Sequence, residues 1–416
     1  ARRLNQALKN YASSPYNKFT TGNLKTLKHD PEKLGLNPRQ ETIDFYKKWY
    51  SANLISASVF GSEDIEEMTK KVIDELSKIE NRHKAPPSLR QIDLWSSPEF
   101  LKQTYFFQTI DEKKQLVIRF TLPSLDYKYQ KVSSIVNHIL GHEGEGTLFA
   151  FLQKNDLAIA LSSSIYSYQE GGQRISQCKI TLTDAGMNNY LQIIEYFFEY
   201  IAMMKAKLPI PESIWQESKD YKAMQFKFMS KNTKTMKLVR DISSALHSPE
   251  YQEAPEKIMS LGIEYPQYDQ QIKDLIAQHL NYYSIDRATI ILNAKSFENM
   301  SGFNTSTLPL LNEDIYGSKY QMKPHSEEFI SKINKIDSWN PEFDLPKPNN
   351  FIPDDFSIIY DEDEDQDLEE VFGPSFSNKE SVDFSKVSLK VCEPLFPDDE
   401  DSEMSCQNVV ANLEAK

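Results

Sequence analysis

The sequence contains little cysteine and no long apolar run. Its three cysteines, Cys178, Cys392 and Cys406, lie at distant and unpatterned positions among 416 residues. This spacing argues against a disulfide framework and against a cysteine zinc cluster. No stretch approaches the roughly 20 apolar residues of a membrane span, and no hydrophobic signal segment opens the chain. We therefore expect no membrane span, a cytoplasmic setting, and a core position for Cys178.

Basic residues are not gathered into a stripe, whereas acidic residues are concentrated at one end of the chain. Residues 354–416 contain 19 acidic and 4 basic residues, a net charge of −15 against −14 for the whole protein. The preceding residues are therefore almost neutral. Because an acidic segment repels phosphates and no basic stripe offsets it, the composition disfavours nucleic-acid binding.

The acidic segment holds a dense run at 361–370 and a second cluster at 398–401. Such charge density with few apolar residues buries too little surface to offset chain entropy, so we expect disorder over 358–416. A solvated linker is one interpretation. A docking strip for a basic partner or substrate is the alternative.

The sequence contains no His-x-x-Glu-His motif, which paired-histidine zinc peptidases of the inverted type require. His138 and His142 are four residues apart and could share a helix face, but Gly141 stands where the catalytic carboxylate is needed. No third or fourth metal ligand is evident nearby. We therefore expect neither a catalytic residue nor a metal site in this chain.

The segment 141–146 contains three glycines, which favours a helix end followed by a tight turn. Absent side chains let a strand or a bound peptide approach the backbone closely. Phosphate binding is a poor alternative, because no Lys-Ser or Lys-Thr pair follows and acidic residues occupy the turn.

Hydrophobic periodicity predicts alternating helices and strands. We expect strands at 54–60, 103–108, 115–120, 157–168, 173–183 and, as the last one, 287–293. Helices are expected at 38–50, 64–79, from about 127, from a Thr183-Asp184 cap through Met204, and at 213–229. Antiparallel strands with helices on one side make an α+β fold.

Several colinear segments of the chain carry a family resemblance: the glycine-rich segment from His138 to Leu152, and residues 15–23, 45–61, 116–126, 180–186, 226–228, 316–320 and 345–356. Together they resemble the insulin-degrading (insulysin) branch of the pitrilysin, or M16, zinc metalloendopeptidases. The resemblance implies pitrilysin-like and mitochondrial-processing-peptidase-like domains with antiparallel sheets flanked by helices. Within that branch the chain is similar to fungal enzymes that process mating-pheromone precursors.

The resemblance also implies a substrate-binding exosite for the amino end of a peptide. The matching positions are His138, Gly141, Glu143, Leu161 and Ser163. Ser163 departs from the glycine of the family, as does Asn137. Glu143 could hold a peptide ammonium, and strand 157–168 could add an extended peptide at a sheet edge.

The match starts in mid-domain, so we expect a fragment of a longer enzyme. Residues 1–85 would be the carboxy-terminal part of the first, catalytic domain, 86–97 a linker, 98–357 the second domain with the exosite, and 358–416 the acidic tail. The family's zinc ligands would precede residue 1, so zinc would be bound outside this sequence and the segment alone would be inactive. Expected partners are peptide substrates and the missing catalytic and C-terminal parts of the enzyme. The alternative is a degenerate homologue that acts as a non-catalytic peptide- or protein-binding scaffold, against which an upstream His-x-x-Glu-His would decide.

Overall fold

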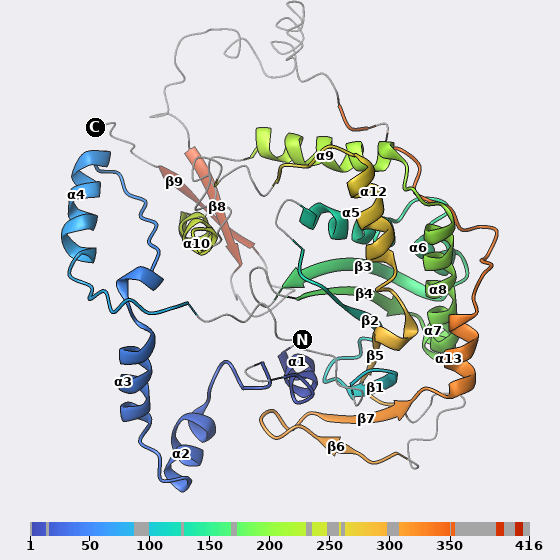
Figure 1. The fold of residues 1–416 in the computed structure, drawn as a ribbon, viewed down its shortest axis with the longest axis horizontal. Coiled ribbons are helices and arrows are strands. Elements are labelled where there is room, and N and C mark those ends of the chain that lie inside the picture. The colour runs from blue at the N-terminus through green and yellow to red at the C-terminus, as the bar shows by residue number, and fades with distance from the viewer. Residues whose placement is uncertain are drawn as a thin grey trace, which may run out of the picture. The chain divides into compact units, whose positions relative to one another are not determined.

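A computed structural model gives the fold (Figure 1). The structure describes residues 2–13, 16–86, 100–125, 129–167, 173–229, 235–247, 258, 263–297, 308–349, 351–353, 388–394 and 404–410. Two compact units are present, Ala1–Ile352 and Pro353–Lys416.

A seven-stranded sheet organises the first unit, in the order β3-β4-β2-β5-β1-β7-β6. Its pairings are antiparallel except for β1 with β5, which run parallel. Because β3 and β6 end this order, each leaves one side of its backbone without a strand partner in the sheet. The strands are β1 Gln103–Gln108, β2 Gln115–Leu122, β3 Ala158–Ser167, β4 Arg174–Leu182, β5 Ala288–Ala294, β6 Leu311–Asn312 and β7 Lys319–Pro324.

Helices cover one face of the sheet. Alternate β2 residues, including Leu116, Ile118 and Phe120, point into a buried cluster shared with these helices, as the period of a strand requires. Figure 1 shows α5, α6 and α8 beside β3 and β4. The helices of this part of the chain are α5 Gln130–Leu140, α6 Leu148–Lys154, α7 Asp184–Asn188, α8 Tyr190–Ala206, α9 Glu212–Lys227, α10 Thr235–Ala245, α12 Gln270–Leu280, η6 Ile285–Arg287 and α13 Glu327–Asn334.

The opposite face of the sheet is only partly covered. Helix α1 (Arg2–Lys9) packs Ala7 and Leu8 against Tyr105 and Val117 in a second, smaller cluster. The remainder of this face carries polar residues and a cavity. The prediction that helices lie against one side of the sheet therefore holds for the main helix layer, and α1 is the exception because it packs on the opposite face.

Residues 16–86 form short helices and extended segments. They are η1 Lys25–His29, α2 Asp30–Lys33, α3 Pro38–Trp49, η2 Ala52–Leu54 and α4 Ile65–Leu76. Asp64 accepts bonds from the first amides of α4, as its polar helix-start position predicts. The predicted strand at 54–60 is wrong: these residues pair with no other strand of the described chain, and a strand needs such a partner.

Two further predictions need correction. The helix predicted from Thr183 through Met204 is broken at Asn189 into α7 and α8, because Asn189 takes a non-helical conformation with ψ at 23°. The strand β5 was predicted to be the last one, but two more strands of the same sheet follow it in the chain. The first is the short β6, and the second is β7, which pairs with both β6 and β1.

The second unit contains an antiparallel pair, β8 Ser388–Pro394 and β9 Met404–Val410. Both strands lie inside the segment for which charge density predicts disorder. They fall in its less acidic parts, and both contain valine, a residue type that is enriched in strands. The dense run at 361–370 lies outside the described residues.

Candidate functional site

The end of α5 lies directly against the edge strand β3. Gly141 follows the last helical residue, and its amide donates to Asn137 O at 2.9 Å. A Cβ at Gly141 would lie 3.1 Å from Asn137 O and 3.2 Å from Ser163 Cβ. The missing side chain is therefore what lets the α5 terminus approach β3 so closely.

Local hydrogen bonds shape the turn that follows. The Gly144 amide donates to His142 Nδ1 at 3.0 Å, and Thr147 Oγ1 donates to Gly144 O at 2.7 Å. Gly146 has φ at +83°, a conformation that favours glycine, and its carbonyl accepts from the Asp344 amide at 2.8 Å. Thr147 then accepts from the Ala150 amide and begins α6.

A buried polar network supports the contact between the end of α5 and β3, which we call the corner. Asn137 Oδ1 accepts from Ser163 Oγ at 2.6 Å and from Ser176 Oγ at 3.1 Å, while Asn137 Nδ2 donates to Ser133 O at 3.0 Å. Tyr283 in turn donates its hydroxyl to Ser176 Oγ at 3.0 Å. The network thus joins α5, β3, β4 and the segment after α12.

Glu143 and Glu145 both lie exposed on this turn, but only one has a partner. Glu145 accepts from Lys347 Nζ at 2.6 Å, and that contact lowers the pKa of its carboxyl. No hydrogen bond or ion pair joins Glu143 to any residue that the structure describes. Its carboxylate is therefore available to an external cation.

His138 lies between the turn and α9. Its Nε2 is 3.9 Å from Glu217 Oε1, and its ring meets His142 edge to face with centroids 5.6 Å apart. Burial, and then the proximity of His142, lower the pKa of His138 despite the opposing effect of Glu217. A neutral imidazole therefore stands here near pH 7.

Leu161, which the family resemblance places at the pocket, has a buried side chain, and the residue also borders the cavity over the sheet. Its side chain is 5% exposed and belongs to the cluster beneath the helices. Only the backbone of this residue can contact a bound peptide. The five predicted positions therefore divide: Gly141 and Ser163 are in contact, Glu143 is free on the adjoining turn, His138 is half-buried against α9, and the Leu161 side chain is buried.

The described side chains do not fit zinc. No group of three His, Cys, Asp or Glu residues within the described ranges is arranged to hold a metal ion. His142 Nδ1 already accepts from a backbone amide, and His138 points to α9. A zinc site needs three or four convergent ligands, so we derive no chemical step through a metal in this chain.

Cys178 is not a nucleophile. It is buried in the core as a free thiol, and burial raises its pKa to about 12. The thiolate that catalysis requires is therefore not formed near neutral pH.

Sequence reasoning missed two members of the corner and the polar face of the sheet. Ser176 and Tyr283 are far from Asn137 in the chain, and no local pattern signals their contact. Polar residues at alternate positions of β2 and β4, including Arg119, Lys179 and Thr181, did carry a signal, because such alternation marks a solvated face. As for membrane spans, each helix within the described ranges is too short or too polar to be one.

Two family models match consecutive parts of the chain. The peptidase M16 inactive domain matches residues 38–221, and the middle or third domain of peptidase M16 matches residues 226–373. Together they span most of the sequence.

The chain is similar to named relatives over most of its length. It is 29% identical to the A-factor-processing enzyme of Saccharomyces cerevisiae and 30% identical to the insulin-degrading enzyme of Homo sapiens, in each case over 83% of this chain and 32% of the relative. The crystal structure of pitrilysin superposes with a TM-score of 0.72 at 22% identity, over 86% of this chain and 36% of that one. The chain therefore spans about a third of the length of these relatives and shares the pitrilysin fold.

Proposed function

The chain belongs to the peptidase M16 family, and from this premise we propose that it is part of a zinc-dependent metalloendopeptidase to which it contributes a peptide-binding exosite and a wall of the substrate chamber. The names of the two relatives, which refer to A-factor and to insulin, favour peptides as substrates. Zinc and the cleavage chemistry would come from residues outside this sequence, and mating-pheromone precursors are one candidate substrate.

One observation carries the proposal. An edge strand with an open backbone side, β3, lies against a turn that presents the unpartnered carboxylate of Glu143. An extended peptide can add to such an edge through main-chain hydrogen bonds. The carboxylate beside it can accept a charge-assisted hydrogen bond from the peptide's terminal ammonium.

The buried network gives this corner a fixed shape. Asn137 holds Ser163 of β3 through a 2.6 Å hydrogen bond, and Gly141 leaves no space between the two elements. Less conformational freedom is then lost when a peptide binds, which favours affinity. The site orients a peptide and does not cut it.

Fluorescence anisotropy on the purified chain tests the proposal. The ligand is one labelled extended peptide, prepared with a free amino terminus and with an acetylated one. We expect Glu143→Gln to weaken binding of the free-amine peptide by about tenfold, the loss of one charge-assisted hydrogen bond. Binding of the acetylated peptide should be weaker in the wild type and unchanged by the substitution.

Glu145→Gln is the matched control, because Glu145 lies two residues away on the same turn and is also exposed. Its ion pair with Lys347 lies at the surface and contributes little stability. Equal binding of both peptides by all three proteins would contradict the exosite and leave residues 141–146 as a structural turn.

A further inference from the structure

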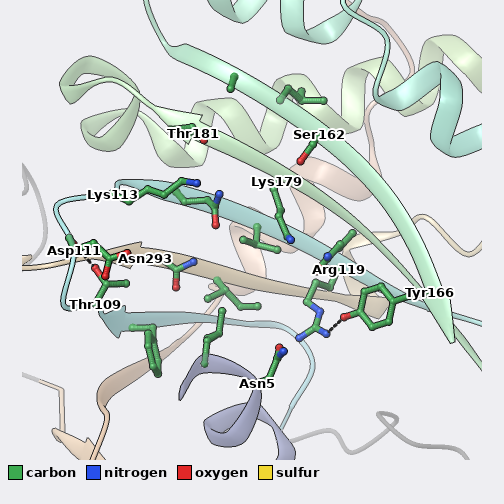
Figure 2. A pocket seen from close by; sticks show the side chains of 18 residues that line it. Asn5, Thr109, Asp111, Lys113, Arg119, Ser162, Tyr166, Lys179, Thr181 and Asn293 are labelled. Carbon is green, nitrogen blue, oxygen red and sulfur yellow. Dashed lines mark hydrogen bonds between the residues drawn. The ribbon is translucent and has the colours of Figure 1, made fainter. Parts of the chain in front are cut away.

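A polar cavity of about 710 Å³ lies over the sheet face opposite the main helix layer (Figure 2). It extends from β3 across β4 and β2 to β5, and Asn5 of α1 borders it. Three of its lining side chains are cationic, Lys113, Arg119 and Lys179. Among the described lining residues Asp111 is the one carboxylate.

Strand register brings two of the cations together. Lys179 lies opposite Val117 across the β2–β4 pairing, and Arg119 lies opposite Gln177, so the two cations are diagonal neighbours. Figure 2 shows both side chains entering the same space, whereas Asp111 lies at the far end beside Thr109. The register also places Lys179 opposite Ser162 of the edge strand β3.

The two cations differ in how they are held. Arg119 is 5% exposed and donates to the Tyr166 hydroxyl, so a neutral group helps to fix the guanidinium. The side-chain ammonium of Lys179 makes no ion pair or hydrogen bond with the residues that the structure describes. Burial, and then Arg119 and Lys113, lower the pKa of Lys179. A bound anion would reverse this effect, since it favours the charged ammonium.

We propose that this cavity binds an acidic side chain of the peptide substrate, with Lys179 as the specificity-determining residue and Arg119 as the fixed neighbouring charge. The inference rests on the proposed function, because it takes β3 as the strand that holds the peptide. It adds a preference for carboxylates on one face of that peptide.

The spacing between strands allows an acidic side chain of a peptide paired with β3 to reach this cavity. A peptide added to β3 would lie two strand spacings from β4, roughly 10 Å. A glutamate on the peptide and the long side chain of Lys179 can bridge that distance when both point to the same face. Because Lys179 lies opposite Ser162, the relevant substrate position is the one that pairs with Ser162, and the positions two residues away share its face.

A position scan by fluorescence anisotropy tests the inference on the full chain. The probes are free-amine peptides with amidated carboxyl ends, in which a single glutamate, or glutamine in its place, is moved along an otherwise neutral sequence. Amidation removes the terminal carboxylate as a second source of the same chemistry. We expect the wild type to prefer glutamate by about tenfold at one position, with a weaker preference at alternate positions only.

Variants then assign the preference to Lys179. Lys179→Met should abolish it without changing the affinity for the glutamine peptides, and Lys179→Arg should retain it. Lys319→Met, which removes an exposed strand lysine of the same sheet outside the cavity, should behave as the wild type. Thermal unfolding of each variant shows that the fold is retained.

Two negative results are distinguishable. If the wild type binds the glutamine peptides but shows no preference for glutamate, or if Lys179→Met keeps the preference, this inference is wrong and the exosite stands. If the wild type binds none of the peptides, the proposed function fails and the inference fails with it.

Discussion

Asn137 should be one of the most sensitive polar positions of the protein, because three hydrogen bonds meet on its side chain. Its amide oxygen accepts from Ser163 and Ser176, and its amide nitrogen donates to Ser133 O. Asn137 is 6% exposed and Ser176 is 1% exposed, so water cannot readily replace the lost partner. Substitution by alanine would leave the Ser176 hydroxyl without its acceptor.

The magnitude follows from these contacts. An orphaned buried donor costs about 1–3 kcal/mol, and each lost net hydrogen bond about 0.5–1.5 kcal/mol. Asn137→Ala should therefore lower the free energy of unfolding by about 2–4 kcal/mol. Ser163→Ala should cost only about 0.5–1.5 kcal/mol, because Asn137 Oδ1 keeps its bond from Ser176.

Urea unfolding followed by tryptophan fluorescence measures these changes, with Trp215 buried in the same core. The double variant should be less destabilised than the sum of the single ones by about 1 kcal/mol, since both remove the same bond. Asn155→Ala is the control: Asn155 is an exposed helix-terminal residue that donates to Phe151 O, so its loss should change stability by less than about 0.5 kcal/mol. An Asn137→Ala protein as stable as this control would refute the network.

Two further predictions concern stability. Gly186→Ala should destabilise the protein by about 3 kcal/mol or more in the same assay, because a Cβ there would lie 1.9 Å from Leu157 O and the backbone would have to move. A change below about 1 kcal/mol would contradict the close packing of α7 against Leu157, the residue before β3. Burial lowers the pKa of His279 to about 4 and the pKa of His325 to about 4. When the pH falls below the ordinary pKa of histidine, the unfolded chain therefore binds more protons than the folded one. Unfolding free energy should therefore fall between about pH 6.5 and pH 4 by about 1.4 kcal/mol per pH unit for each histidine, and His279→Gln should show a shallower dependence than the wild type.

The sequence predicted those elements whose signal is local. Alternating apolar residues marked β1 to β4, and the Asp64 cap marked the start of α4. Apolar content alone also suggested a strand at 54–60, which no described strand pairs with. The parallel contact of β1 with β5 and the return of β7 to β1 depend on pairings between segments far apart in the chain, which periodicity does not encode.

In the candidate site, too, the sequence predicted the features with a local signal and missed the contacts between distant residues. The three glycines after α5 predicted a turn that allows close approach, and Gly141 does pack on Ser163. Asn137 and Ser163 were recognised separately as departures from the family pattern, and the fold places them in one hydrogen bond. Leu161 was placed at the pocket by the family resemblance alone, and the burial of its side chain, which the alternation of β3 produces, was not foreseen.

Amide hydrogen–deuterium exchange of the full chain, with and without a free-amine peptide at saturating concentration, shows whether β3 and the adjoining turn hold the amino end of an extended peptide. We expect slower exchange in β3 and residues 141–146, and no change at β6, the other edge of the same sheet. Slower exchange at β6, or unchanged exchange at β3 while the peptide is bound, would contradict this placement of the peptide.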